Sequence, residues 1–259
     1  MYDIQKASVL KRLSAFLFDF IFIAIISVGI AFVISGITNF YGTLDSYQAH
    51  IDNYAEEHGI KLDITEEEYN ALSEDERKLY DGMGMELFNN EDFVHDYELI
   101  ISLTLVMVTL SPFVAFLMLE FLVPLFLKNG QTLGKKIFAI GVVRMDSVRL
   151  TPLVLFARNI LGKFTIGTMI PLYMAVFIFM QAIFGISFMS PLVCVVVFAG
   201  IVLLNVGLFI FTRTRSCIHD CFSSTVVVDM ATQMIFESAE ERLEYKKRIH
   251  LEATEKAKY

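Results

Sequence analysis

The sequence predicts an all-α membrane protein. We expect a bundle of four transmembrane helices with an acidic extracellular helical insert, an interfacial amphipathic helix and a small cytoplasmic β ribbon. The composition is 55% hydrophobic with a mean hydropathy of +0.58, whereas soluble domains are about 45–50% apolar. The apolar residues are gathered in long blocks, and the segments between the blocks alternate in charge. These observations indicate membrane spans and not one large soluble core.

Residues 1–36 are expected to form a cytoplasmic N-terminus and the first span. The apolar block from Leu13 to Gly36 is long enough for the roughly 20 residues that a helix needs to cross the hydrocarbon core. A cleaved signal peptide is the alternative, but its apolar region is only about 7–15 residues long and precedes a small-residue cleavage site. This block is longer and lacks such a site, so we expect an uncleaved span.

Residues 37–97 are expected to form the acidic extracellular insert. They contain 16 Asp and Glu against three Lys and Arg. Thr65 and Ser73 each stand three residues before a glutamate, which is the pattern of a capping box. We expect two or three short amphipathic helices, with a solvated, weakly ordered loop as the alternative. Their apolar sides would carry Tyr47, Tyr54, Tyr69, Leu72, Leu79 and Tyr80.

Residues 98–234 are expected to form the membrane core, and residues 235–259 a charged cytoplasmic tail helix. Thr151-Pro152 is a typical helix start, and the apolar spacing after it predicts an interfacial amphipathic helix. The stretch 164–212 has no charged residue and is too long for one span, so the turn-forming segment 185–191 divides it. The remaining spans are therefore expected at about 99–127, 164–184 and 192–212.

The distribution of basic residues predicts the orientation. Lys and Arg are concentrated in the N-terminus, in the segment 128–163 and in the tail. Cytoplasmic loops carry such an excess. We therefore expect a multi-pass protein of the cell membrane with both termini in the cytoplasm.

Two carboxylates inside the predicted spans are the sharpest candidate site residues. Asp19 follows Arg12 by seven residues and so lies on nearly the same helix face. Glu120 should lie at a similar depth from the cytoplasmic side. A carboxylate within a span is costly and needs a partner. Two carboxylates at one depth can repel each other, share a proton, bind a cation or be bridged by an arginine, and Arg12 and Arg158 are the available bridges. A buried ion-pair network that fixes helix packing and a cation or proton site are both open interpretations.

Other chemistry is not indicated. Cys217, His219, Asp220 and Cys221 lie close together in sequence, but a closed zinc site needs about four ligands, and we predict no metal, cofactor or disulfide. There is no nucleophile elbow, phosphate loop or HExxH pattern, so we do not expect an enzyme. No basic stripe alternates with aromatic residues, so nucleic-acid binding is not expected.

Several motifs together resemble the RDD family of membrane proteins. They are Arg12-Leu-Ser-Ala-Phe-Leu-Phe-Asp19, Asn129-Gly-Gln-Thr-Leu-Gly-Lys-Lys136, Ile140-Gly-Val-Val143, Arg158-Asn159, His219-Asp220 and Thr225-Val-Val-Val228. The resemblance implies that Arg12, Asp19 and Asp220 are the residues that name the family, and it implies transport. Family members commonly carry a glycine where this chain has Ser224, and the extracellular insert is longer than in a minimal member. The signature residues are Gly130, Thr132, Gly134, Lys135, His219 and Thr225.

These motifs also have a physical interpretation. Two glycines, Gly130 and Gly134, permit a tight turn after the second span, and Lys135 and Lys136 would then lie near anionic headgroups. The β-branched runs Val142–Val143 and Val226–Val228 predict a small antiparallel ribbon on the cytoplasmic side. Such a ribbon would make Asp220 available to Arg144, Arg149 or Arg158.

The leading functional hypothesis is transport of a small solute, a cation or a proton, with Asp19 and Glu120 as the binding carboxylates. The alternative is a non-transporting scaffold or regulatory partner that uses the acidic insert or the tail. Expected partners are the lipid bilayer, a small cation or solute, and either a second copy of the chain or another membrane protein. Four spans are few for a monomeric transporter, which is why an oligomer is expected.

Overall fold

The computed structural model describes residues 4–62, 64–127, 129–168, 191–212 and 214–256, with the backbone alone for 191–198. The predicted span at 164–184 and the turn at 185–191 therefore lie almost entirely outside the described residues. The chain divides into two compact units. The ribbon unit comprises residues 1–23 and 116–259, and the insert unit comprises residues 24–115.

Helices dominate both units, and two of them are long and apolar enough to cross a membrane. The first is α1, Val9–Ile37, with 29 residues. The second candidate is the 37-residue helical stretch Glu91–Leu127. It consists of α5 (Glu91–Leu117), a π-helical segment η1 (Met118–Leu122) and α6 (Val123–Leu127). Residues Ala199–Phe211 of α10 (Pro191–Phe211) form a shorter apolar helix.

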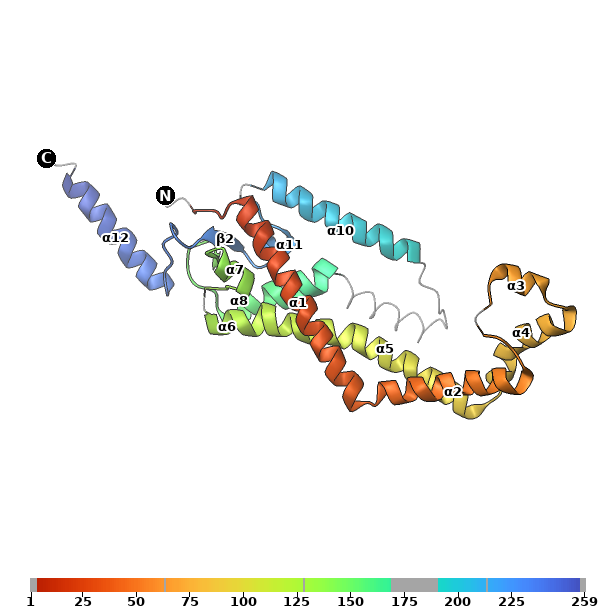
Figure 1. The fold of residues 1–259 in the computed structure, drawn as a ribbon. Helices are drawn as coiled ribbons and strands as arrows, with labels where there is room; N and C mark the ends of the chain where they lie inside the picture. The colour runs from red at the N-terminus through yellow and green to blue at the C-terminus, as the bar shows by residue number, and fades with distance from the viewer. Residues whose placement is uncertain (1–3, 63, 128, 169–190, 213, 257–259) are drawn as a thin grey trace, which may run out of the picture. The chain divides into compact units, whose positions relative to one another are not determined.

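The insert unit contains ordered helices, which favours the folded interpretation of the acidic segment. Its helices are α2 (Phe40–His58), α3 (Glu66–Ala71) and α4 (Glu74–Leu87), and α3 and α4 lie by the C-terminal end of α2 (Figure 1). Both predicted capping boxes are present, at Thr65 and Ser73. The expectation of short helices is wrong for α2, which has 19 residues. This helix is amphipathic, and its apolar side is buried against Leu87 and Phe93.

The predicted ribbon between the two valine runs is confirmed. Strand β1 (Ile140–Arg144) pairs antiparallel with β2 (Thr225–Asp229), with Val142 opposite Val227 and Val143 opposite Val226. Because side chains alternate along a strand, the ribbon has two apolar faces. One packs on Ala7 and Ala15 of the N-terminal segment, and the other packs on Ile4 and Ile235.

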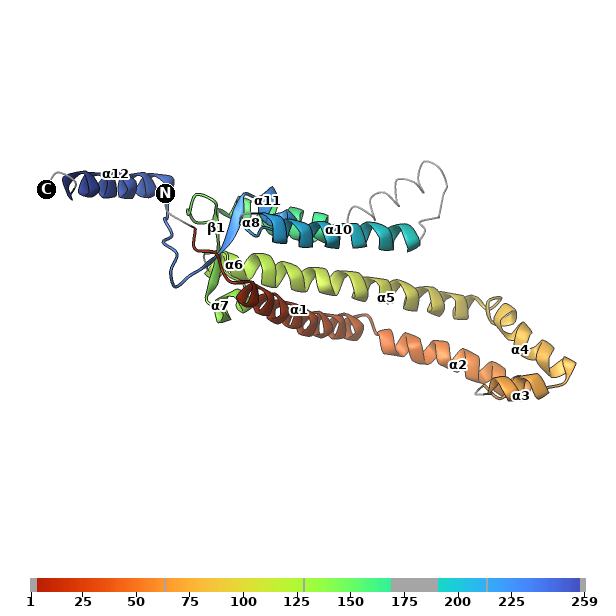
Figure 2. The same ribbon diagram turned by 90° about the horizontal axis from the view of Figure 1, so that it is seen from above.

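Short helices surround the ribbon. They are α7 (Leu133–Ile137), α8 (Pro152–Phe156), the π-helical η2 (Ala157–Ile166) and α11 (Ile218–Phe222), and Figure 2 shows α7 and β1 side by side. Thr151 caps α8 and Pro152 is its first residue, as predicted. The tail forms α12 (Ala239–Lys256), whose Tyr245 contacts Phe236 just after the ribbon.

A tight turn forms before β2 although this chain has Ser224 where members of the RDD family, which it resembles, commonly carry a glycine. Ser224 adopts φ 52°. Its amide donates to the Cys221 carbonyl, and its own carbonyl accepts from Met145. A serine therefore occupies a left-handed conformation that glycine adopts at lower cost.

Candidate functional site

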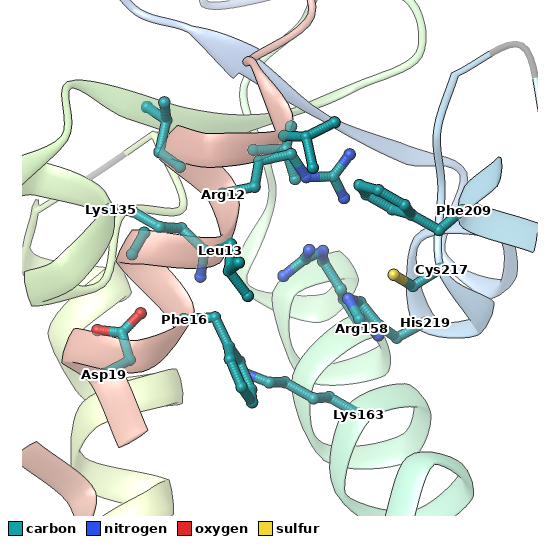
Figure 3. Close-up of a pocket in the computed structure, with 14 residues that line it drawn as sticks. Arg12, Leu13, Phe16, Asp19, Lys135, Arg158, Lys163, Phe209, Cys217 and His219 are labelled. Carbon is teal, nitrogen blue, oxygen red and sulfur yellow. The ribbon is translucent and has the colours of Figure 1, made fainter. Parts of the chain in front are cut away.

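A partly open pocket of about 280 Å³ lies in the ribbon unit beside the first span. Its walls come from α1, α7, η2, α10, α11 and the ribbon. Figure 3 shows Asp19 and Lys135 on one side, Arg158 and Lys163 on the other, and Leu13 and Phe16 between them. The pocket therefore gathers charged side chains that are far apart in the sequence around an apolar surface.

Asp19 is buried, with 3% of its surface exposed, and both of its oxygens accept hydrogen bonds from the start of α7. The Thr132 hydroxyl donates to Oδ2 at 2.5 Å, and the Gly134 amide donates to Oδ1 at 2.8 Å. The free amides at a helix N-terminus favour such a carboxylate. Helix α1 is thus fastened to the segment that follows α6.

Gly134 is required for that close approach. A Cβ at this position would fall on the backbone carbonyl of Ala15 and on the Asp19 carboxylate. The expectation that Gly134 serves a turn is wrong, because its φ is not positive, whereas Gly130 does take φ 59° in the turn before α7. Gly134 is needed because α7 approaches α1 too closely for a side chain at this position, and not because the backbone requires a positive φ.

Asp220 is the centre of the second charge cluster and is fully buried. Arg158 donates to its Oδ1 from Nε at 3.1 Å and from Nη2 at 2.5 Å. Arg12 donates to Oδ2 at 3.2 Å. Arg158 was one of the three arginines predicted to reach Asp220. Arg12 and Arg158, the bridges available to Asp19 and Glu120, instead direct their guanidinium groups to Asp220.

Glu120 is the centre of the third cluster, also fully buried. Lys163 donates to its Oε1, and the Lys135 ammonium lies 3.7 Å from Oε2. The Asn159 amide donates to the backbone carbonyl of Glu120, which ties η2 to η1. The prediction that Lys135 lies near headgroups is wrong, since its side chain is buried between these charges while Lys136 is exposed.

Both helical segments of this cluster have π-helical hydrogen bonding. Glu120 lies in η1, and Arg158, Asn159 and Lys163 lie in η2. The wider π turn changes which side chains share a face, and π turns inside helices are frequent at functional sites. Here the altered spacing turns Arg158, Asn159 and Gly162 all to the buried side.

The environments of three groups outside the spans shift their pKa values. Burial lowers the pKa of Lys135 to about 8, against the opposing effect of Glu120. Burial also lowers the pKa of His219 to about 3. For Asp220 burial alone would raise the pKa, but the positive charges of Arg158 and Arg12 hold it well below its usual range. At neutral pH the ribbon unit therefore contains an ionised Asp220 beside a neutral His219.

The Cys217, His219 and Asp220 side chains meet here, with one ligand atom of each within 4.8 Å of the others. The carboxylate in this group already binds two guanidinium groups, whose positive charge disfavours a metal ion beside it. The remaining signature residue, Thr225, is buried and accepts a hydrogen bond from Arg158 Nε at 3.2 Å.

Sequence reasoning missed two participants. Lys163 binds Glu120, and Phe209 of α10 lies under the Arg12 guanidinium at 4.9 Å. Lys163 could have been found from the position of Glu120, because a carboxylate in a span requires a cation and Lys163 is the last charge before the uncharged stretch. No sequence signal distinguishes Phe209 from the other phenylalanines.

Comparison with known proteins bears on the identity of the chain. No curated protein and no solved structure matches it. A model of the RDD family matches residues 6–224, a range that includes Arg12, Asp19, Glu120, Arg158 and Asp220. Since this match spans most of the chain, the protein belongs to the RDD family.

Proposed function

We propose that this RDD protein is a four-span, multi-pass protein of the cell membrane that moves a small solute through the pocket of the ribbon unit. RDD proteins are membrane-associated, and two helices here are long and apolar enough to span. Large apolar side chains of α1 are exposed, among them Val28 at 68% and Phe32 at 70%. Such a surface suits contact with lipid. In this proposal both termini and the ribbon are cytoplasmic.

The observation that carries the proposal is the concentration of charge around one pocket beside a span. Ionisable groups within membrane segments are costly, and they commonly mark solute or ion pathways. At about 280 Å³ the pocket is close to the lower end of the range for small-molecule sites, which is about 300–1,000 Å³. Its walls come from α1, η2 and α10, so a relative shift of these helices would alter it.

A small solute fits the geometry better than a bare cation bound by Asp19. Both Asp19 oxygens are used by Thr132 and Gly134, and Glu120 is flanked by two lysines. A cation would have to displace these donors. Both carboxylates therefore serve mainly to position helices, and the cations around them face the pocket.

Reconstituted proteoliposomes test this proposal. Currents on a solid-supported membrane would be recorded for Na⁺, K⁺ and a panel of small organic anions and cations. We expect a current with at least one organic solute, lost in Lys135→Gln and kept in the exposed-lysine control Lys136→Gln. A fully silent panel with correctly folded protein would overturn transport.

The scaffold alternative retains one supporting observation. The insert has its own aromatic cluster, with Tyr47 stacked on Phe93 and with Phe88 and Met85 exposed. If the protein serves as a scaffold, deleting residues 45–92 should remove its cellular activity, while Lys135→Gln should leave that activity in place. If it transports, the two changes should have the reverse effects.

A further inference from the structure

The residues that line the pocket carry more positive than negative charge. Four cations line it: Arg12, Lys135, Arg158 and Lys163. The one carboxylate among the lining residues is Asp19. Its oxygens already accept two hydrogen bonds from neutral donors, so it offers little to a ligand.

Three of these cations have hydrogen-bond partners. Arg158 and Arg12 share Asp220, and Arg12 also donates to the Arg215 carbonyl. Lys163 donates to Glu120. Each of these side chains is thus held by a contact that does not involve the pocket.

Lys135 is the exception. Among the described residues its buried ammonium has no hydrogen-bond partner, and neither has Oε2 of Glu120, 3.7 Å away. The residue is 9% exposed, and its nitrogen points into the pocket (Figure 3). A buried charged donor without an acceptor is strongly unfavourable. The pocket wall therefore contains a cation that has Glu120 as an ion-pair partner but no hydrogen-bond acceptor among the described residues.

Apolar side chains cover the rest of the pocket wall. Leu13 and Phe16 of α1 lie beside Lys135, and Phe209 lies across from them. An inorganic anion would leave this surface in contact with water. An anion that carries an apolar chain would satisfy both parts of the lining.

We propose that the pocket binds an amphipathic anion, with its carboxylate or phosphate head on the Lys135 ammonium and its chain against Leu13, Phe16 and Phe209. The proposal names the solute class of the transport proposed above and rests on it for movement across the membrane. Binding itself is independent of movement. The head could belong to a free amphiphile or to a membrane lipid, and the two sources share this chemistry.

The protonation state of Lys135 gives the site a pH dependence. Glu120 of η1, Arg158 and Lys163 of η2 and Asp19 of α1 are the charges that face it. Burial brings its pKa to about 8, so the ammonium loses its charge as pH rises through that value. Anion binding should therefore weaken above pH 8.

The test uses full-length protein in nanodiscs of zwitterionic lipid. Radiolabelled octanoate is bound in a scintillation proximity assay, with octyl phosphate, octanol and octyltrimethylammonium as unlabelled competitors. We expect octyl phosphate to compete and the other two to compete at least tenfold more weakly. Equal competition by octanol or octyltrimethylammonium would overturn the proposal.

Variants locate the site. Lys135→Gln should weaken octanoate binding at least tenfold, whereas Lys136→Gln should leave it unchanged. Phe16→Ala should weaken octanoate more than acetate. Unchanged octanoate binding in folded Lys135→Gln would overturn the proposal. If that variant does not fold, Phe16→Ala decides the matter, since equal losses of octanoate and acetate binding would overturn the proposal.

Two further comparisons distinguish a lipid head from a free amphiphile, and anion binding from transport. Nanodiscs that contain phosphatidylglycerol reduce octanoate binding if a lipid head occupies the pocket, and leave it unchanged if a free amphiphile does. Octanoate binding without any solute current means that transport fails and the anion site stands. A current for another solute without octanoate binding means that the anion site fails and transport stands.

Discussion

Thr132 donates a hydrogen bond to Asp19, a residue 113 positions earlier in the chain. The contact joins the helix cap of α7 to α1. Thr132 also caps α7 itself by accepting from the Lys135 amide. One hydroxyl thereby places Lys135 at the pocket and holds α1 against the segment that carries it.

Replacing Asp19 with asparagine should weaken this junction. The asparagine side chain has one acceptor oxygen and an amide donor, so one of the two donors from α7 loses its acceptor. We expect a loss of about 1–3 kcal/mol in the free energy of unfolding. Chemical denaturation in detergent measures it, with the exposed Asp45→Asn as control. Equal stability of the two variants would contradict the role of Asp19 as a fastener.

Gly134→Ala tests the close approach of α7 to α1. The added methyl group would overlap the Ala15 carbonyl and the Asp19 carboxylate. Overpacking of this kind costs about 1–3 kcal/mol. The matched control is Gly207→Ala in α10, where a Cβ meets no atom of the described residues within 4 Å. Thermal unfolding of both variants should show a lower melting temperature for Gly134→Ala alone.

The effects of substituting Arg158 and Asp220 on the free energy of unfolding should be strongly coupled. Removing one partner of a buried ion pair costs about 3–5 kcal/mol because the other charge is left uncompensated. We expect Arg158→Met and Asp220→Asn each to be destabilising, and the double variant to lose clearly less than their sum. The partly exposed pair of Arg144 and Asp146, 3.1 Å apart, serves as the control cycle, with coupling below about 1 kcal/mol. Additive losses at Arg158 and Asp220 would refute the coupling.

His219 should make stability depend on pH. Its folded pKa is about 3 against 6.5 for the free side chain, so between these values the unfolded state binds the proton and the folded state does not. Stability should therefore fall as pH drops from 6.5 toward 3, by up to ~1.4 kcal/mol per pH unit. His219→Gln should flatten this part of the curve, and the exposed His95→Gln should not. Denaturation midpoints between pH 7 and pH 4 measure the difference.

Ser224→Gly should stabilise the protein. Serine at φ 52° bears a steric cost of ~1–2 kcal/mol that glycine avoids, although glycine loses about 0.5–1 kcal/mol of that gain to chain entropy. We expect a net gain of up to ~1 kcal/mol. Ser223→Gly, at an ordinary negative φ, should be destabilising because the Ser223 hydroxyl donates to the His219 carbonyl. A gain in both variants would argue against the left-handed turn.

Local signals predicted a large part of this fold. The capping boxes at Thr65 and Ser73 and the start of α8 at Thr151 depend on neighbours a few residues away. The ribbon followed from two short β-branched runs. The capping boxes and the start of α8 are each encoded in one contiguous stretch. The ribbon is not, because it pairs residues as far apart as Val142 and Val227.

The pairing of charges could not be obtained in the same way. Arg12, Arg158, Lys135 and Lys163 are all cations near the predicted membrane boundary, and nothing local decides which of them reaches Asp19, Glu120 or Asp220. The π-helical spacing of η2 also escapes a search for a 3.6-residue period. The choice of partner is made by the packing of η2 and α7, which is a property of the whole unit.

The separation of the Arg12 and Asp220 partners has a consequence for biosynthesis. They lie 208 positions apart, so the ribosome delivers the arginine of α1 long before its counter-charge. Until residues 217–229 emerge, the arginines and the open edge of β1 have no final partner. A chain that ends early would therefore be left with uncompensated cations and an unpaired strand, the features by which cellular quality control recognises an unfinished protein.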